Sequence, residues 1–450
     1  MSETMSADDR DRLSALVANA TKRGADAADA VLIRSTSLSH AQRLGEIEKL
    51  ERQESFDLGL RVFKGKKQAI VSSTDFSVTA LDELVGRALD MASTVPDDPW
   101  GGLANPDQLA TEIPDLDMVD SDEPASEVLI EMARTCEDAA RAVTGITNSD
   151  GAEASWSHSH ITLAASNGFA GNYARTDCGV GVSVIAGEGT EMEAEYDFAH
   201  AVYRSDLEDA AAVGTRAGER TVARLGARRM ATSQVPVVFD PRVAGGLLGH
   251  LSGAITGPSI ARGTSFLKDS LGKQIFSRGI RVIDDPHRPR GMRSKPFDAE
   301  GVANEKRALV EDGTLTTWLL DLSSARQLDM QSTGHAGRGT SGPPSPGPTN
   351  LYLEPGTVSR EALLADTGTG FYITSLMGMG VNGVTGDYSR GASGFWIENG
   401  EIAFPVTEMT IAGNLKDMFL SLTPADDLEF RYGTNSPTVR IEGLTVAGGG

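Results

Sequence analysis

The histidines are the residues of this sequence best suited to metal or acid–base chemistry, but their spacing is unlike that of a metal-binding helix. A zinc peptidase helix presents two histidines on one face, with a third ligand and a general base close by. No pair among the seven histidines shows that spacing. His158 and His160 would share one face of a strand, and the neighbouring sequence supplies no obvious third ligand. An exposed strand is the favoured interpretation.

Two short motifs match the signatures of other enzyme classes but lack their surroundings. Residues 378–383 have the GxGxxG spacing of dinucleotide-binding loops, yet the residues after them predict turns and strands rather than the helix that such a site requires. Ser265 and Lys268 have the SxxK spacing of Ser–Lys acyl-transfer enzymes, without the accompanying Ser-Asp-Asn and Lys-Thr-Gly elements. Neither motif predicts a catalytic centre.

Hydrophobic periodicity indicates the elements that must position these residues. Apolar residues at helical spacing predict helices over residues 6–23, 78–92, 125–142 and 207–225. Strand-like segments are predicted at residues 30–33, 156–165 and 179–185. Alternating apolar residues on both sides of a turn at residues 64–66 predict a β-hairpin. The first half of the chain therefore combines helices with strands.

A new structural unit is predicted to begin near residue 235, at an apolar run that ends in Asp240. Short strand-like segments and many glycines and prolines follow, including a Gly/Pro/Ser-rich loop at 332–350 of a length typical of disordered or functional loops. We predict an α+β fold with three domains. They are a mixed N-terminal domain with antiparallel sheet and helices (1–115), a middle α/β region (116–230), and a β-rich, barrel- or sandwich-like C-terminal domain (231–450).

Composition and charge narrow the class of partner. The formal net charge is −22, which disfavours binding to the phosphate backbone of a nucleic acid. Two cysteines are too few for a disulfide framework or a cysteine-rich metal site. No apolar run approaches the length of a membrane span, and the first residues show no apolar leader segment. We expect a cytoplasmic protein without nucleic-acid or membrane partners.

Several long blocks of the sequence resemble the TldD/PmbA family, and in particular its TldE (PmbA) branch. They lie at residues 51–75, 249–257, 265–276, 295–328 and 380–419, and the last reads GVNGVTGDYSRGASGFWIENGEIAFPVTEMTIAGNLKDMF. The resemblance implies a cytoplasmic zinc metallopeptidase built as a heterodimer of related TldD and TldE chains. In that family, TldD carries an HExxxH-type helix, whose glutamate is the expected general base, and a cysteine ligand from near its C-terminus.

The positions of that zinc motif are degenerate in this chain. On the family pattern, Gly249 and Ala254 stand where the two histidine ligands would be, and His250 stands where the base would be. No cysteine follows Cys178 to complete the site. The resemblance therefore implies no catalytic residue and no metal ligand here, and it assigns the zinc to a TldD-like partner. It also implies a role in enclosing a chamber or binding peptide, and homodimers when the chain is alone.

The block around residues 382–390 contains the candidate peptide or interface contacts, which are Asn382, Asp387, Tyr388 and Arg390. A tightly turned β-corner explains the same residues equally well. The basic run at residues 278–295 is a second candidate surface, with a solvated loop as its alternative. Two other functions stay open. The chain could be an active peptidase with a metal at His250 or at the pair of strand histidines, or a gyrase-modulator type of interaction protein.

Overall fold

The first half of the chain builds one long antiparallel sheet. The computed structural model describes residues 2–448, with side chains described from residue 8 onward. The strands, in the order β3-β2-β1-β4-β5-β6, are β1 (Ala27–Arg43), β2 (Glu46–Lys64), β3 (Lys67–Ser73), β4 (Ile146–Ala165), β5 (Ala170–Ala186) and β6 (Glu193–Ala201). The central pair, β1 and β4, runs in register from Asp29↔Ala165 to Gln42↔Ala152. One sheet therefore contains strands from both sides of residue 115, the predicted boundary between the first two domains.

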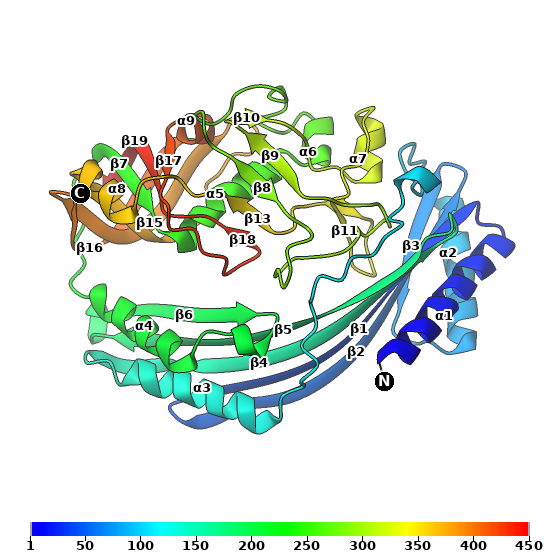
Figure 1. The fold of residues 1–450 in the computed structure, drawn as a ribbon, viewed down its shortest axis with the longest axis horizontal. Coiled ribbons are helices and arrows are strands. Elements are labelled where there is room, and N and C mark those ends of the chain that lie inside the picture. Colours follow the sequence, from blue (N-terminus) through cyan, green and yellow to red (C-terminus); the bar gives the residue numbers. More distant parts are fainter. Residues whose placement is uncertain (1, 449–450) are drawn as a thin grey trace.

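Four helices cover one face of this sheet (Figure 1). They are α1 (Ser2–Lys22), α2 (Val78–Thr94), α3 (Ser126–Arg141) and α4 (Ala210–Ala223). Even-numbered strand residues such as Leu32 and Leu58 pack against α1 and α2, while Leu38 and Val180 pack against α3 and α4. Because side chains alternate along a strand, the odd-numbered residues of β1, β2, β4 and β5 point to the opposite face. Val31 and Leu163 on that face contact Phe297 of the C-terminal part.

Most of the elements predicted in this half are confirmed, although several are longer than predicted. The hairpin turns at Gly65 and Lys66, between Lys64 and its register partner Lys67. The short strand predicted at residues 30–33 is the middle of the long strand β1. Strand β6 was missed, as was the charged first half of β2. Between α2 and α3 the chain is extended, apart from the 3-10 turn η1 (Pro106–Gln108).

The C-terminal part contains a closed five-stranded barrel, which confirms the predicted barrel-like fold. Its strands are β7 (Ser233–Phe239), β14 (Gly370–Met377), β15 (Asp387–Glu398), β16 (Glu401–Asn414) and β19 (Val439–Gly448). They pair in the order β16-β15-β14-β7-β19, and a β16–β19 pairing closes the ring. The short β17 (Leu422–Pro424) adds to β19. Only the β7–β14 pair of the ring is parallel.

Smaller elements flank the barrel. A second sheet has the order β10-β9-β8-β13-β18, formed by Thr314–Leu315, Arg307–Glu311, Val282–Asp284, Leu351–Leu353 and Thr434–Asn435. The helices of this part are α5 (Pro241–Ala254), α6 (Gly257–Ala261), α7 (Leu322–Gln327), α8 (Arg360–Thr367) and α9 (Leu415–Leu420). In the first half of the chain, residues 189–191 form the 3-10 turn η2 and residues 204–206 form the 3-10 turn η3, on either side of β6. The largest apolar core lies between α5, the barrel and the second sheet.

The loop predicted at residues 332–350 is ordered, and it lies over the sheet. Its two short strands, β11 (Ala336–Gly337) and β12 (Ser345–Pro346), pair with each other. The backbone of Thr340 approaches Gly59 of β2 so closely that a Cβ at residue 59 would clash with it. A glycine is therefore required where this loop crosses the strand.

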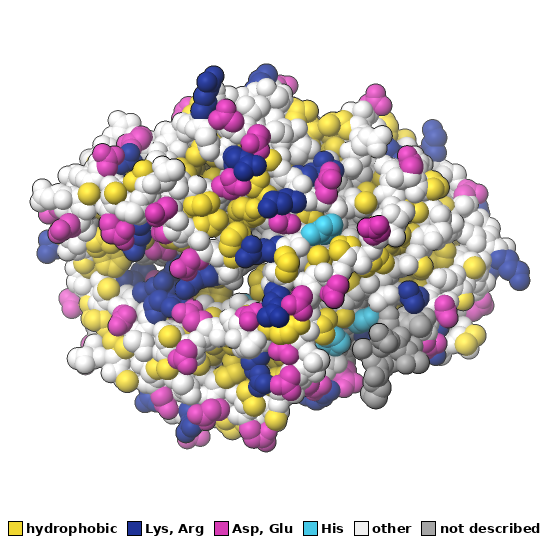
Figure 2. Space-filling model, viewed as in Figure 1, with side chains coloured by type: hydrophobic (Ala, Val, Ile, Leu, Met, Phe, Trp, Pro, Cys, Tyr) yellow, Lys and Arg dark blue, Asp and Glu magenta, His cyan; other side chains and the backbone are white. Residues whose placement is uncertain are grey.

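Figure 2 shows a hollow between the sheet and the C-terminal part, with basic side chains gathered beside it. A pocket of about 350 Å³ at this junction is lined by Arg216, Arg242, Arg360 and Arg431, among others. Most of these cations are already paired. Arg216 bridges Glu208 and Asp197, and Arg242 lies 3.2 Å from Glu195. The positive charges around this hollow are therefore largely balanced by nearby carboxylates.

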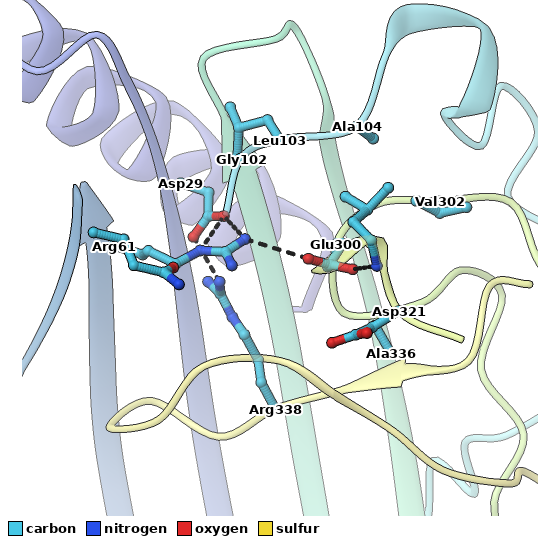
Figure 3. Close-up of polar contacts among 12 residues, drawn as sticks. Asp29, Arg61, Gly102, Leu103, Ala104, Glu300, Val302, Asp321, Ala336 and Arg338 are labelled. Atoms are coloured by element: carbon cyan, nitrogen blue, oxygen red, sulfur yellow. Dashed lines mark hydrogen bonds and ion pairs between the residues drawn. The ribbon is translucent and has the colours of Figure 1, made fainter. Parts of the chain in front are cut away.

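A buried ionic cluster joins the sheet to the C-terminal part (Figure 3). Asp29 of β1 accepts hydrogen bonds from Arg61 Nε at 2.9 Å and from Arg338 Nη1 at 2.6 Å. Glu300 lies 3.7 Å from Arg61 and accepts a hydrogen bond from the Leu322 amide. Burial alone would raise the pKa of Asp29, but the two guanidiniums outweigh it and hold that pKa below its usual value.

None of the helices within residues 2–448 combines the length and the apolar character that a bilayer crossing requires.

Candidate substrate pocket at helix α5

Helix α5 carries the degenerate motif positions, and its own residues explain its formation. Asp240 caps the N-terminus by accepting a hydrogen bond from the Arg242 amide at 2.9 Å, and Pro241 occupies the first turn, where it costs no helical hydrogen bond. Leu247 and Leu251 are buried in the C-terminal core. The glycines lower the helix propensity of this segment, so burial of one apolar face is what stabilises the helix.

The glycine-rich face of α5 opens onto a pocket of about 290 Å³. Gly249, His250 and Ala254, the three positions of the degenerate motif, all line it. A Cβ added to Gly249 would meet no atom within 4 Å, and the same holds for Gly253. The helix therefore exposes bare backbone to the pocket at the position where the family pattern has a histidine.

The opposite wall comes from the region of the second set of candidates. Arg390 of β15 lines the pocket, and so do Met379 and Gly383 in the loop between β14 and β15. Phe266 forms a further wall, and its amide donates a hydrogen bond to the Gly383 carbonyl at 2.9 Å. Sequence reasoning placed the two groups of candidates in separate blocks. The fold brings all three residues of the first group and Arg390 of the second to a single cavity.

Tyr388 supports the pocket from behind. Its ring meets the His250 ring edge to face, with centroids 5.8 Å apart. The phenol is buried in the core, and burial raises its pKa to about 12. Burial also lowers the pKa of His250, and the charge of Arg390 lowers it further. At neutral pH the pocket therefore contains an uncharged imidazole next to a fixed positive charge.

Asn382 and Asp387 make local hydrogen bonds and do not line this pocket. The Asn382 side-chain oxygen accepts a hydrogen bond from the Val384 amide at 2.9 Å, as in an Asx turn. Asp387 accepts hydrogen bonds from the Thr385 hydroxyl at 2.6 Å and from Asn414 Nδ2 at 3.1 Å. These hydrogen bonds lower the pKa of Asp387. Both residues shape the loop that carries Met379 and Gly383.

A zinc ion does not fit the residues of this pocket. Gly249 and Ala254 have no donor atom, and His250 offers a single imidazole where a zinc site needs three or four ligands. Arg390 adds a positive charge that would repel a cation. Among the residues whose side chains are described, 8–448, no three histidine, cysteine, aspartate or glutamate side chains are grouped so that they could share a metal ion.

The alternative metal ligands predicted on the sheet lie in ordinary strand positions. His158 and His160 are half-buried on β4, and burial lowers the pKa of both. His158 stacks on Trp156, with ring centroids 6.4 Å apart. Another pocket, of about 510 Å³, runs across this sheet from β1 and β2 to β6, and neither histidine lines it.

The two short motifs that resembled other enzyme classes turn out to be walls of the α5 pocket. Residues 378–383 lead into strand β15 and not into a helix, as predicted. Ser265 donates a hydrogen bond to the Ala254 carbonyl at 2.6 Å and so ties its segment to the end of α5, while Lys268 is exposed. Phe266 and Met379 were not singled out as site residues. The 93% exposure of the Met379 side chain, within a glycine-rich loop, is evident only in the structure.

The basic run at residues 278–295 is largely engaged within the molecule. Arg281 contacts Glu311 and Glu354, and Arg290 contacts Asp117 and Asp206. The buried Lys295 donates a hydrogen bond from Nζ to the Ala336 carbonyl at 2.8 Å. Burial lowers the pKa of its amine. Much of this run therefore helps to hold the C-terminal part together and to join it to the middle region.

Sequence comparison matches three domain models of one family along the chain. They describe the PmbA/TldA metallopeptidase domain 1 at residues 28–92, the central domain at residues 120–225 and the C-terminal domain at residues 232–448. The α5 pocket lies within the C-terminal match.

Individual relatives agree over almost the full length. A protein of Escherichia coli O157:H7 named metalloprotease PmbA is 40% identical over 425 residues, which are 94% of this chain and 92% of that protein. A PmbA homologue of Haemophilus influenzae is 38% identical, covering 98% and 96% of the two chains. Both relatives are named as metalloproteases.

Solved structures show the same architecture. A Bacteroides thetaiotaomicron protein named as a candidate modulator of DNA gyrase superposes with a TM-score of 0.91 at 26% identity, covering 98% of this chain and 99% of that one. TldE of Thermococcus kodakarensis gives a TM-score of 0.87 at 22% identity, covering 97% and 100%. At that identity the second match is evidence for the fold alone.

Proposed function

This chain belongs to the PmbA/TldA metallopeptidase family, and from that premise we propose that it is the non-catalytic subunit of a two-chain zinc peptidase. The complex acts on peptides or unfolded proteins, and a TldD-like partner supplies the zinc and the general base. This chain contributes a wall of the chamber and a surface that holds peptide. We place the complex in the cytoplasm, where its two buried, unpaired cysteines would stay reduced.

The observation that carries the proposal is the composition of the α5 pocket. Helix α5 forms one wall of the pocket, but Gly249, His250 and Ala254 stand where the family pattern has two ligands and a base. Arg390 adds a positive charge to the same cavity. A site built this way does not activate water as a metal does, because an imidazole beside a guanidinium has neither the charge nor the open coordination position of zinc.

Co-expression with the TldD-like protein of the same organism tests this proposal. We expect the two chains to co-elute in size-exclusion chromatography and to cleave an unstructured fluorogenic peptide. Omission of either chain should abolish cleavage. Replacing the base glutamate of the partner by glutamine should do the same, whereas His250→Ala in this chain should leave the chemical step intact. Cleavage by this chain alone, lost on His250→Ala, would overturn the proposal.

The same preparation separates the proposal from an interaction role. The relative named as a candidate gyrase modulator raises DNA gyrase as an alternative partner. Affinity capture of the full chain from cells should therefore recover the TldD-like protein. Recovery of gyrase subunits without any TldD-like protein would contradict a peptidase role. Size-exclusion chromatography of the chain alone would also show whether it forms homodimers in the absence of its partner.

A further inference from the structure

Arg390 is a cavity-lining arginine that has no carboxylate partner in the described part of the chain. Among the described residues, none places an acidic oxygen within 4.0 Å of it in a salt bridge. Its Nε atom is fully covered and has no hydrogen-bond partner. A covered guanidinium costs desolvation free energy, and proteins usually offset that cost with an acidic group. In the α5 pocket the compensating group is absent from the chain itself.

The rest of the pocket suits a small anion attached to an apolar group. Phe266, Val381 and Leu415 supply apolar surface, while Gly249 and Gly253 leave the helix side open. The volume of about 290 Å³ is at the small end of ligand pockets, which hold roughly 300–1,000 Å³. It is therefore large enough for a single residue of a peptide and too small to enclose a longer segment.

We propose that the α5 pocket binds a carboxylate group of a peptide, with Arg390 as the residue that pairs with it. A guanidinium presents two parallel N–H groups that match the two oxygens of a carboxylate. The adjacent His250 ring offers a further N–H group. The apolar walls then receive the side chain of the residue that bears the carboxylate. This inference rests on the proposed function, because it assigns a ligand to a subunit that handles peptides.

The loop beside the pocket extends the surface available to the rest of the peptide. Met377, Met379 and Val384 expose 55%, 93% and 55% of their surface. Met377 ends β14, and the other two lie in the loop between β14 and β15. Met side chains adapt to varied apolar partners. The carboxylate would thus fix one residue of the peptide, while the loop contacts its neighbours with little sequence preference.

Fluorescence polarisation with three labelled peptides tests the inference on the full chain. The probe is a fluorescein-labelled Gly-Ser-Gly-Ser-Ala-Leu peptide with a free C-terminal carboxylate. The second form is its C-terminal amide, and the third is an amide in which glutamate replaces the leucine. We expect the free acid to bind about 10- to 100-fold more tightly than the leucine amide, as for a charge-assisted hydrogen-bonded pair.

The variants attribute this difference to one residue. Arg390→Met should reduce binding of the free acid to that of the amide, and Arg390→Lys should retain part of the preference because it keeps the charge. Arg87→Met is the matched control, since it removes an exposed arginine that does not line the pocket. It should leave all three affinities unchanged. Circular dichroism checks that each variant is folded, and the comparison of acid with amide in the unmodified chain does not depend on any variant.

The outcomes show whether the pocket binds a carboxylate and, if it does, whether that group is a C-terminus or an acidic side chain. If only the free acid binds tightly, the ligand is a peptide C-terminus. If the glutamate amide binds as tightly, the pocket also accepts acidic side chains, and a carboxylate site is still supported. Equal affinity for the free acid and both amides would overturn the inference. A preference that survives in folded Arg390→Met would overturn it as well.

A chelator distinguishes this inference from the proposed function. The titrations are repeated in EDTA, and the zinc content of the chain is measured beforehand. If a zinc-free chain binds the free acid and the amides equally, the carboxylate site is wrong but the proposed non-catalytic role stands. Stoichiometric zinc, with peptide binding lost in EDTA, would remove the proposed non-catalytic role.

Discussion

Two regions of this molecule use arginine in opposite ways. At the junction of the sheet with the C-terminal part, Arg61 and Arg338 are buried and hydrogen bonded to Asp29 (Figure 3). At the α5 pocket, Arg390 is half-buried, with a covered Nε and no acidic partner among the described residues. The first arrangement has its carboxylate within the chain, whereas we propose that the second acquires one when a peptide binds.

The contrast shows how a structural charge can be told from a binding charge. A buried carboxylate and its guanidiniums compensate one another, so removing one of them lowers the free energy of unfolding. A guanidinium that lines an open, glycine-walled pocket contributes little to the free energy of unfolding, and its removal lowers the affinity for a ligand instead. Four substitutions test this division, and each is measured as a change in the free energy of unfolding in urea.

Asp29→Asn should have the largest effect, a loss of about 3–5 kcal/mol, because it leaves two buried guanidiniums facing each other without their carboxylate. Asp366→Asn is the control, since it breaks an ion pair with Arg440 whose aspartate is 73% exposed. That change should cost no more than about 1 kcal/mol. Similar losses for the two variants would show that the junction does not depend on its buried charges.

Glu300→Gln should flatten the pH dependence of stability between pH 4.5 and pH 8. Burial raises the pKa of Glu300 from 4.5 to about 8, so the native state keeps a proton that the unfolded chain releases. The free energy of unfolding therefore falls as the pH rises through this window. The unmodified chain should lose on the order of 1–3 kcal/mol more than the variant. Parallel pH curves would mean that Glu300 is ionised in the native state.

Gly249→Ala should stabilise the chain by about 0.5–1 kcal/mol, because alanine is the better helix former and its methyl group would enter open space. Gly59→Ala is the matched control in the other region, where the methyl group would meet the backbone of Thr340. That variant should be destabilised. A loss of stability in Gly249→Ala would indicate that the helix face is not open.

Arg390→Met should have the smallest effect, within about 0.5 kcal/mol in either direction, because no acidic partner loses its counterion. The same variant should lose the preference for peptide carboxylates. A stability loss as large as that of Asp29→Asn would place Arg390 among the structural charges.

The sequence predicted elements best where one face of a segment meets an apolar core. Leu13, Leu16 and Val17 follow helical spacing, and all three are buried in α1. Strand β6 was missed because its inward residues include Glu195 and Asp197, which are buried but paired with arginines instead of apolar groups. Asp197 pairs with Arg220 of α4, and Glu195 pairs with Arg224, which directly follows that helix. The first half of β2 is exposed on both faces, so it shows no alternation.

The candidate site was predictable only in its parts. The family resemblance located Gly249, His250 and Ala254 on a helix, and it located Arg390 in a separate block. Their meeting in one pocket depends on the packing of α5 against the barrel, which no local pattern records. The same holds for Asp29 and Arg338, which are 309 residues apart in the chain.

The zinc content of the full chain, purified without chelators and measured by mass spectrometry, is the most direct test of the central claim. The TldD-like partner, purified in the same way, is the positive control. A non-catalytic subunit should contain substoichiometric zinc even after incubation with excess metal and dialysis, while the partner contains one zinc per chain. One tightly held zinc per chain in this protein, lost on His250→Ala, would contradict the claim.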